Sequence, residues 1–317
     1  AAVRTDLAAA LAPAAGGRSL KDETRIADGA PPAFAEAVRF AAELAPRLAR
    51  GRITLSERNL TIDGQSLDPD AFEALRAAVN GPLPADFRLL RFSVNAPVVS
   101  PYTWQMTRSG GEIRLTGYVP TDTLRRDLLA AAGQVAGARV VDDLQVGDGA
   151  PDRFTELART MTAQAARLEA GTVALRDSAI TVDGTAATPE GYAAVLQDLG
   201  GWLPGGAKAK LDLKPARVAP YVWNAKVERW VVRLTGFVPS DEERKRVIEG
   251  LKASLPRGIE IRDDTRIAAG AGPDFEAALR FAIRRAGELA DGTLSISDAS
   301  VKVAGTARNA DSFRAYN

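Results

Sequence analysis

The sequence predicts an α+β fold made of small two-layer modules in tandem, and three observations support this. The chain repeats itself about every 120 residues: Pro101-Tyr102-Thr103-Trp104 returns as Pro220-Tyr221-Val222-Trp223, and 115–120 returns as 234–239. Self-similarity at a fixed period indicates one structural unit used several times. Within each period, some stretches have apolar residues at helical spacing, and others alternate apolar and polar residues as a strand does. Each period also divides into two related halves of about 60 residues.

The first half, here called the A module, predicts the order αββαβ. In the copy at 151–217, Phe154, Leu157, Met161 and Leu168 form one helical stripe. A hairpin with its turn at 176–178 follows, and then a helix from Pro189 and a closing strand near 209–213. The sequence also predicts where the opening helices of this module begin and where one of them is interrupted. Asp152 and Asp274 are predicted N-terminal caps, and Pro46 is predicted to kink or shorten the first helix.

The second half, the B module, predicts the order ββαβ. It begins with the Tyr-x-Trp strand and continues into a Leu-Thr-Gly strand that ends at Pro120 or Pro239. Ser240 and Glu243 have the spacing of a capping box, which marks a helix start. A closing strand follows at 140–146 in one copy and 259–267 in the other.

The two kinds of module alternate along the chain, with a partial module at each end. The partial modules are consistent with a cropped chain, which is the favoured interpretation. In the alternative, the ends of two copies join head to tail to complete one αββαβ module. The predicted modules are a partial helix-strand module at 1–28, A1 at 32–97, B1 at 98–148, A2 at 151–217, B2 at 218–269 and a partial A3 at 273–317.

Composition excludes several classes of function. The chain has no His and no Cys, so imidazole catalysis, thiolate nucleophiles and zinc–thiolate sites are absent. The net charge of +1 gives no strong field to attract nucleic acid, and no nucleic-acid partner is expected. The longest Ala/Leu-rich stretch, 7–15, is too short for a transmembrane segment. Absence of Cys is compatible with a bacterial periplasm.

Cofactor and metal sites are not expected either. The phosphate-loop and dinucleotide-binding glycine patterns are missing in the required strand–helix context. Asp142-Asp143 and Asp263-Asp264 are paired carboxylates, but neighbours on a strand point to opposite faces and do not readily share one ion. No catalytic, cofactor-binding or metal-binding residues are assigned, and the chain is predicted not to be an enzyme.

The candidate binding or module-junction surface is aromatic. One interpretation is a membrane-interface or partner-docking face, because Tyr and Trp favour half-wet apolar sites. The favoured alternative is packing, either over the helix of the same module or at the junction with the preceding A module. A weaker candidate is a basic cluster on the last A helix, which either contacts lipid phosphates or is a solvated face. The residues are Tyr102, Trp104, Tyr118, Tyr221, Trp223 and Phe237 for the aromatic surface, and Arg280, Arg284 and Arg285 for the basic cluster.

The B modules resemble the BON family of the bacterial cell envelope. The family pattern, a V-x-L-x-G-x-V strand, a helix and a G-V-x-x-V-x-(D/N)-x-(L/I)-x-V segment, is matched closely by 113–119 and 137–146 and more loosely by 232–238 and 261–267. The 120-residue arrangement is also similar to the periplasmic arms of alphaproteobacterial OmpA-family proteins.

This resemblance implies a non-enzymatic, periplasmic protein associated with the outer membrane or cell wall, in which repeated BON-like modules form an arm or scaffold. The implied partners are other envelope proteins or copies of the chain itself, and peptidoglycan through a domain outside these 317 residues. The alternative that it implies is binding to phospholipid surfaces through the strand aromatics and basic helix faces.

Overall fold

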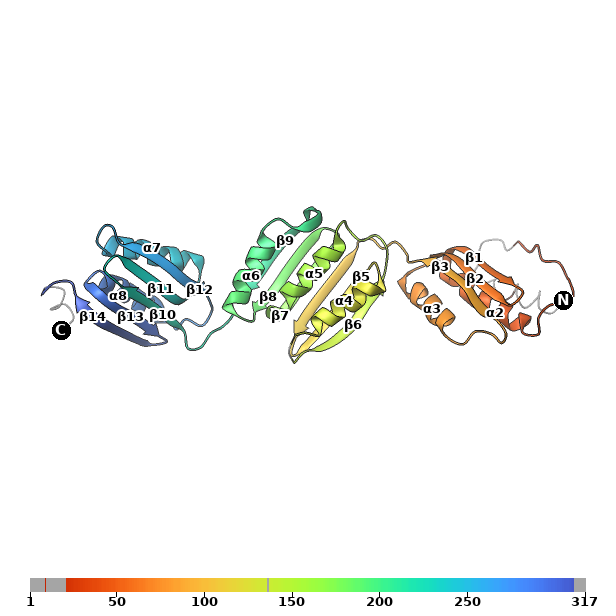
Figure 1. Cartoon of the computed structure of the whole chain (residues 1–317), viewed down its shortest axis with the longest axis horizontal. Coiled ribbons are helices and arrows are strands. Elements are labelled where there is room, and N and C mark those ends of the chain that lie inside the picture. Colours follow the sequence, from red (N-terminus) through yellow and green to blue (C-terminus); the bar gives the residue numbers. More distant parts are fainter. Residues whose placement is uncertain (1–8, 10–20, 136, 311–317) are drawn as a thin grey trace.

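The molecule consists of three α/β units that follow one another along its long axis (Figure 1). The computed structural model describes residue 9 and residues 21–135 and 137–310. Each unit contains one sheet, with three strands in the first unit, six in the middle unit and five in the third. The predicted α+β class is confirmed.

The first unit has the predicted αββαβ order and a sheet in the order β1-β2-β3. Strands β1 and β2 form an antiparallel hairpin, and β3 lies parallel to β2. Pro46 falls in a short 3-10 turn at Ala45–Arg47, so the first helix ends at Leu44 as predicted. The elements are α2 (Phe34–Leu44), β1 (Leu48–Ser56), β2 (Asn59–Ser66), α3 (Pro69–Asn80) and β3 (Arg88–Asn95).

The middle unit joins a ββαβ half and an αββαβ half in one six-stranded sheet, in the order β6-β5-β4-β7-β8-β9. Its two halves meet where β4 pairs antiparallel with β7. The sheet therefore continues across the predicted boundary between modules B1 and A2. The elements are β4 (Thr103–Ser109), β5 (Glu112–Val119), α4 (Asp122–Ala132), β6 (Arg139–Val146), α5 (Phe154–Ala165), β7 (Leu168–Arg176), β8 (Ala179–Ala186), α6 (Pro189–Gly200) and β9 (Lys208–Lys214).

The third unit repeats this arrangement. Its sheet has the order β12-β11-β10-β13-β14, and β10 pairs antiparallel with β13 as β4 does with β7. The predicted partial module 273–317 supplies α8, β13 and β14, and its residues 311–317 lie outside the described part of the chain. The elements are β10 (Val222–Val227), β11 (Val231–Val238), α7 (Asp241–Ser254), β12 (Glu260–Ile267), α8 (Phe275–Ala286), β13 (Leu289–Ser297) and β14 (Ser300–Ala307).

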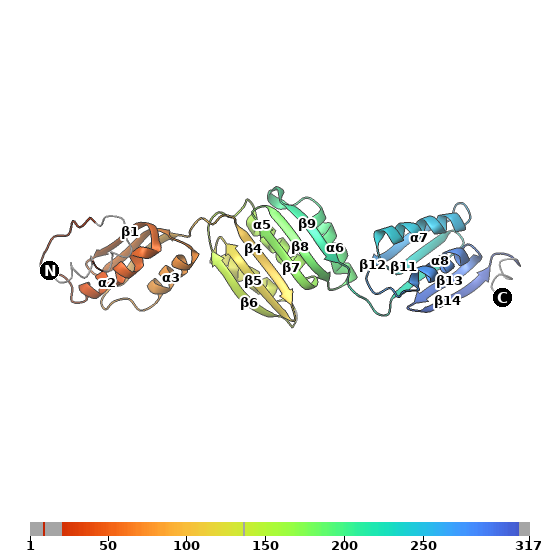
Figure 2. The same cartoon turned by 180° about the vertical axis from the view of Figure 1, so that it is seen from behind.

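Helices cover one face of each sheet (Figures 1 and 2). The buried apolar side chains come from both the helices and the strands, so the hydrophobic core lies between the two layers. In the middle unit, a single cluster of buried side chains contains residues from both halves, including Leu128 of α4 and Met161 of α5. Apolar residues alternate along the strands, so one face of each strand enters this core. Each B–A pair therefore shares one hydrophobic core.

Helix starts follow the predicted chemistry in the B halves but not in the A halves. Ser240 Oγ accepts a hydrogen bond from the Glu243 N–H at 3.2 Å, which confirms this cap. The prediction for the two A-half aspartates was wrong: α5 begins after Arg153 in a left-handed conformation, and Asp274 makes no side-chain cap hydrogen bond.

Most of the predicted partial module at 1–28 lies outside the described residues. Of its described residues, residue 9 is helical, and 21–28 form neither a helix nor a strand. Among the described helices, none has both the length and the apolar character needed to cross a bilayer.

Candidate functional site

The Tyr residue of each Tyr-x-Trp motif ties the two halves of a unit together. The Tyr102 N–H donates to Asp177 Oδ1 at 2.9 Å, and the Asp177 N–H donates back to the Tyr102 carbonyl at 2.7 Å. Asp177 stands in the β7–β8 turn with φ of 54°, a conformation that Asp tolerates better than most residues. Tyr221 and Asp298 repeat both hydrogen bonds in the third unit, at 2.9 and 3.0 Å.

Both Tyr rings are buried between the helical layer and the sheet. Tyr102 meets Phe154 of α5 edge-on, with ring centroids 5.1 Å apart, and Tyr221 meets Phe275 of α8 at 4.9 Å. The hydroxyl groups donate to backbone carbonyls, at 3.4 Å for Tyr102 to Gly147 and 3.2 Å for Tyr221 to Ala268. Burial raises the pKa of both phenols above the ordinary value. The Tyr rings therefore serve as neutral packing groups at physiological pH.

The Trp residues of the two motifs are also internal. Trp104 and Trp223 are each 0% exposed, opposite Leu175 of β7 and Ile296 of β13 respectively. Neither Trp Nε1 has a hydrogen-bond partner in the described part of the chain. The sequence allowed the interpretation that these strands form a membrane-interface or partner-docking face. Because the two Trp rings and the two Tyr rings are buried, they do not form such a surface.

The aromatic residues at the ends of the Leu-Thr-Gly strands support the same junction. Tyr118 lies 6.0 Å from Tyr102 and Phe237 lies 5.9 Å from Tyr221, between ring centroids, and both outer rings are half-buried. The expected junction with the preceding A module was wrong in direction. Strand β4 pairs with β7, so these aromatics join each B half to the A half that follows it.

The repeated Gly of the Leu-Thr-Gly motif has a steric cause. Gly117 adopts φ of +97°, and a Cβ there would lie 2.4 Å from the Thr103 carbonyl oxygen of β4. Gly236 repeats this with φ of +92° and 2.2 Å to the Val222 oxygen. Close backbone approach, and not a ligand, accounts for the motif, as the sequence indicated.

A second repeated set of contacts holds the segment that connects one unit to the next. The Asp148 N–H donates to the Pro97 carbonyl at 2.8 Å, and the Asp148 carbonyl accepts from the Val99 N–H at 2.9 Å. Ala269 makes the same pair of hydrogen bonds with the Ala216 carbonyl and the Val218 N–H. In each connecting segment, two backbone groups thus bond to the N–H and the carbonyl of a single residue of the unit that follows.

Side chains from the second A helix reinforce these links. Asp70 Oδ1 of α3 accepts from Gln145 Nε2 of β6 at 2.6 Å, and Glu190 of α6 pairs with Arg266 of β12 at the corresponding positions. Val146, at the end of β6, belongs to the hydrophobic cluster of the first unit. Arg76 of α3 also forms an ion pair with Asp122 of α4, at 2.6 Å. The first and middle units are therefore joined by polar, ionic and apolar side-chain contacts, and the middle and third units by an ion pair at the corresponding place.

The basic cluster on α8 is largely neutralised by its neighbours. Arg280 pairs with Glu276, and Arg285 pairs with Glu288 at 2.8 Å while its guanidinium stands 5.2 Å from the Phe281 ring. Arg284 is exposed. These contacts describe a solvated helix face in which two of the three Arg side chains are paired with Glu.

The paired aspartates also have separate partners. Asp142 pairs with Arg125 of α4, whereas Asp143 pairs with Arg114 of β5. Within the ranges that the structure describes, no group of three or more acidic side chains is arranged to hold a metal ion.

Two exposed Trp residues were missed by the sequence analysis. Trp202 follows α6 and is 76% exposed, and Trp230 lies in the β10–β11 turn and is 63% exposed. Each ring has an Arg guanidinium close to its centroid, Arg153 at 5.8 Å and Arg229 at 5.4 Å. The available signal was that neither Trp has a counterpart in the repeat. The aromatic residues of the repeated Tyr-x-Trp motif lie in the core that the units have in common, so a Trp without a counterpart in the repeat is a candidate for a surface role.

The family comparison agrees with the resemblance of the first B module. A search among curated proteins gives no significant match. The family model of the BON domain matches residues 96–148, which comprise β4, β5, α4, β6 and the segment that leads into them. BON domains are associated with the cell envelope and with phospholipid binding. Residues 96–148 of this chain are therefore similar to a BON domain, and in this chain they pair through β4 with β7 of the module that follows.

Proposed function

We propose that this chain is a non-enzymatic arm or scaffold of the bacterial cell envelope, located in the periplasm and associated with the outer membrane or cell wall. The observation that carries the proposal is the repetition of one side-chain contact between neighbouring units, Asp70 with Gln145 and Glu190 with Arg266. A chain that repeats both its units and the contacts between them is suited to holding two attachment points at a fixed separation. The BON match at 96–148 supports the envelope location.

Stiffness of the arm is measurable because the native chain has no Cys. Two exposed positions, Arg58 of the first unit and Lys252 of the third, are replaced by Cys and spin-labelled for electron–electron distance measurement. A single narrow distance distribution is expected. A broad distribution over many separations contradicts the scaffold proposal, because units that turn freely hold no fixed separation.

A matched pair of variants sharpens this test. E190A/R266A removes the ion pair between α6 and β12, and E276A/R280A removes an ion pair within α8. The first double substitution is expected to broaden the distribution, and the second is expected to leave it unchanged. Equal effects of the two would show that the inter-unit contact does not set the angle.

A second candidate function, binding of the chain to a phospholipid surface, is favoured by Trp202 and Trp230. Trp prefers the membrane–water interface, and a neighbouring Arg adds attraction to anionic headgroups. The buried strand aromatics do not contribute to this surface in the folded state.

Liposome co-sedimentation tests the lipid proposal. Vesicles with and without phosphatidylglycerol are offered to the chain, to W202A/W230A and to L90A, where Leu90 is an exposed apolar control. Binding that requires anionic lipid and is lost only in the double Trp variant supports the proposal. Equal sedimentation of all three proteins, or none, contradicts it.

A further inference from the structure

The open face of the middle sheet has an uncharged centre. Helices cover only one face of the sheet, so the outward-facing side chains of its strands lie on the other face (Figures 1 and 2). One row of these side chains crosses four strands: Gln105 of β4 lies opposite Thr116 and Ala174, and Ala174 lies opposite Thr181. None of the four carries a charge, although 26% of the residues of the chain do. Depletion of charge is typical of the centre of a binding surface.

A depression of 390 Å³ lies over this row. A neighbouring row also lines it, in which Thr103 of β4 lies opposite Arg176 of β7 and Arg176 lies opposite Ala179 of β8. Sites for small ligands usually have volumes of about 300–1,000 Å³. The depression therefore has the size for a small molecule or for a short segment of a polymer.

The polar groups of the depression are available for a ligand. Within the part of the chain that the structure describes, the hydroxyl groups of Thr103, Thr116 and Thr181 make no hydrogen bond to another side chain or to the backbone. Each hydroxyl can both donate and accept, and so can the amide of Gln105. The methyl groups of the two Ala residues offer little area for an apolar ligand. A ligand with several hydroxyl groups of its own, such as a sugar, matches this lining.

Cations gather at one end of the two rows. Lys208 of β9 lies opposite Ala179, and Lys210 lies opposite Thr181. Lys208, Lys210 and Arg176 are exposed, and none of them forms an ion pair with another described residue. Lys on an edge strand also discourages pairing with other strands, but Arg176 belongs to β7, which has a partner on each side. Three unpaired cations beside the hydroxyl groups favour a ligand that carries an acid group.

The third unit retains the row but not its available groups. Asn224 lies opposite Thr235 and Ser295, in the register of the middle unit, and Lys302 takes the place of Thr181. The Ser295 hydroxyl donates to Asn224 Oδ1 at 2.7 Å, so these two groups bond to each other. The middle unit is therefore the better candidate for a ligand site.

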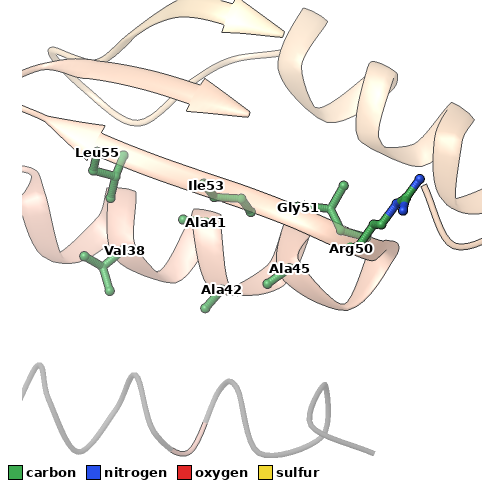
Figure 3. A pocket seen from close by; sticks show the side chains of 9 residues that line it. Val38, Ala41, Ala42, Ala45, Arg50, Gly51, Ile53 and Leu55 are labelled. Carbon is green, nitrogen blue, oxygen red and sulfur yellow. The ribbon is translucent and has the colours of Figure 1, made fainter. Parts of the chain in front are cut away.

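Another pocket has a different chemistry. It has a volume of 460 Å³ and lies between α2 and β1 of the first unit (Figure 3). Its lining includes the apolar side chains of Val38, Ile53 and Leu55, which form no hydrogen bonds. The depression on the middle sheet is instead lined by hydroxyl, amide and guanidinium groups.

We propose that the depression over β5, β4, β7 and β8 of the middle unit binds an acidic sugar. The sugar hydroxyl groups form hydrogen bonds with Thr116, Gln105 and Thr181. The carboxylate of the sugar accepts hydrogen bonds from Arg176, with Lys208 nearby. The site adds a ligand to the middle unit and depends neither on the proposed arm nor on lipid binding.

The test titrates the whole isotope-labelled chain with two acidic sugars and their neutral parents, and follows the backbone amides by NMR. Glucuronic acid is paired with glucose, and N-acetylmuramic acid with N-acetylglucosamine. Saturable shifts at 103–105, 116–117 and 174–181 are expected with at least one acid, and its neutral parent should bind at least about tenfold more weakly. The acid that binds shows whether the carboxylate is needed on the sugar ring or on a side chain.

Variants of the hydroxyl groups have a matched control. T116V/T181V removes two hydroxyl groups but keeps the branched shape of the side chains, and it is expected to weaken binding of the acid about tenfold. T54V/T61V makes the same change at paired outward positions of the first sheet and should leave binding unchanged.

Variants of the cations complete the design. R176Q/K208Q is expected to lower the affinity for the acid to that for its neutral parent. K245Q/K252Q removes two exposed cations of α7 and should have no effect.

Three outcomes would overturn the proposal. The first is that neither acid gives saturable shifts, or that the shifts map away from the depression. The second is equal affinity for the acids and their neutral parents, because the cations then do not hold the ligand. The third is self-association of the chain that is lost in T116V/T181V but not in T54V/T61V, because the occupant is then a second copy.

Discussion

Tyr102, which immediately precedes β4, and Phe154 of α5 stand edge-to-face, with ring centroids 5.1 Å apart and ring planes at 74°. The two residues come from different predicted modules, B1 and A2, yet they pack in one core. Together with the β4–β7 pairing, this contact shows that modules B1 and A2 share one sheet and one hydrophobic core. Removal of an aromatic residue from one half is therefore expected to destabilise both halves.

Trp104→Ala is expected to destabilise the middle unit by about 3–5 kcal/mol, because it removes a fully buried ring and leaves a cavity. Urea denaturation measures the change in the free energy of unfolding, and amide hydrogen exchange measures the protection of α4 and β8 in the same variant. Both elements are expected to lose protection together. Trp202→Ala is the control and should change the free energy of unfolding by less than about 0.5 kcal/mol. Loss of protection in α4 alone would contradict a shared core.

Gly117→Ala is expected to destabilise the middle unit by about 1–3 kcal/mol, because the new Cβ meets the Thr103 carbonyl in a left-handed backbone conformation. Gly133→Ala is the matched control, since its backbone is helical and its nearest neighbour would be 3.4 Å away. Thermal unfolding distinguishes them. A control substitution as harmful as the test substitution would refute the steric explanation of the motif.

Asp177→Ala is expected to cost about 1–2 kcal/mol, because the Tyr102 N–H loses its acceptor and Ala tolerates the left-handed turn poorly. Asp177→Asn should be milder, since its amide oxygen can still accept and Asn adopts this conformation more readily. Chemical denaturation of the two variants beside Ser178→Ala gives the comparison. An equal loss in the Asn variant would show that charge, and not geometry, matters at this turn.

Acidification is expected to remove a stabilising contact at Asp198. Hydrogen bonds from Arg167 and then Gln164 lower the pKa of this carboxyl below its ordinary value. A lowered pKa in the folded state contributes stability that is present above the ordinary Asp pKa, about 3.9, and is lost as the pH falls through the folded-state value. Urea midpoints of the wild type and Asp198→Asn should therefore differ near neutral pH and converge as the pH falls below the ordinary Asp pKa and through the folded-state value. A difference that is constant with pH would exclude this linkage.

Much of the local structure could be predicted from the sequence. The helical stripe from Phe154 to Met161, the hairpin turn at Asp177 and the Ser240 cap all lie where the patterns indicate, because each depends on neighbours within a few residues. The A-half caps failed for a related reason. Asp152 and Asp274 are common cap residues, but the chain enters α5 through a left-handed Arg153, so Asp152 stands too far back.

The candidate site was predicted less well. The motif aromatics were identified as a junction or a binding surface, but their burial and the direction of the junction depend on contacts such as Tyr102 with Asp177, 75 residues apart. Trp202 and Trp230 were not predicted as site residues, because neither has a counterpart in the 120-residue repeat on which the prediction was based. Exposure of a single side chain is decided by the whole fold and has no local signature.

The sequence by itself determined the elements, their order and their 120-residue recurrence, since helical and strand periodicity are local consequences of where apolar side chains fall. Only the tertiary structure decided that a B half pairs with the A half after it, so that the repeat consists of two half-units in one sheet. The physical reason is that alternation specifies which face of β4 is buried but not which strand lies along its edge. That choice is made by non-local backbone hydrogen bonding and the shared core.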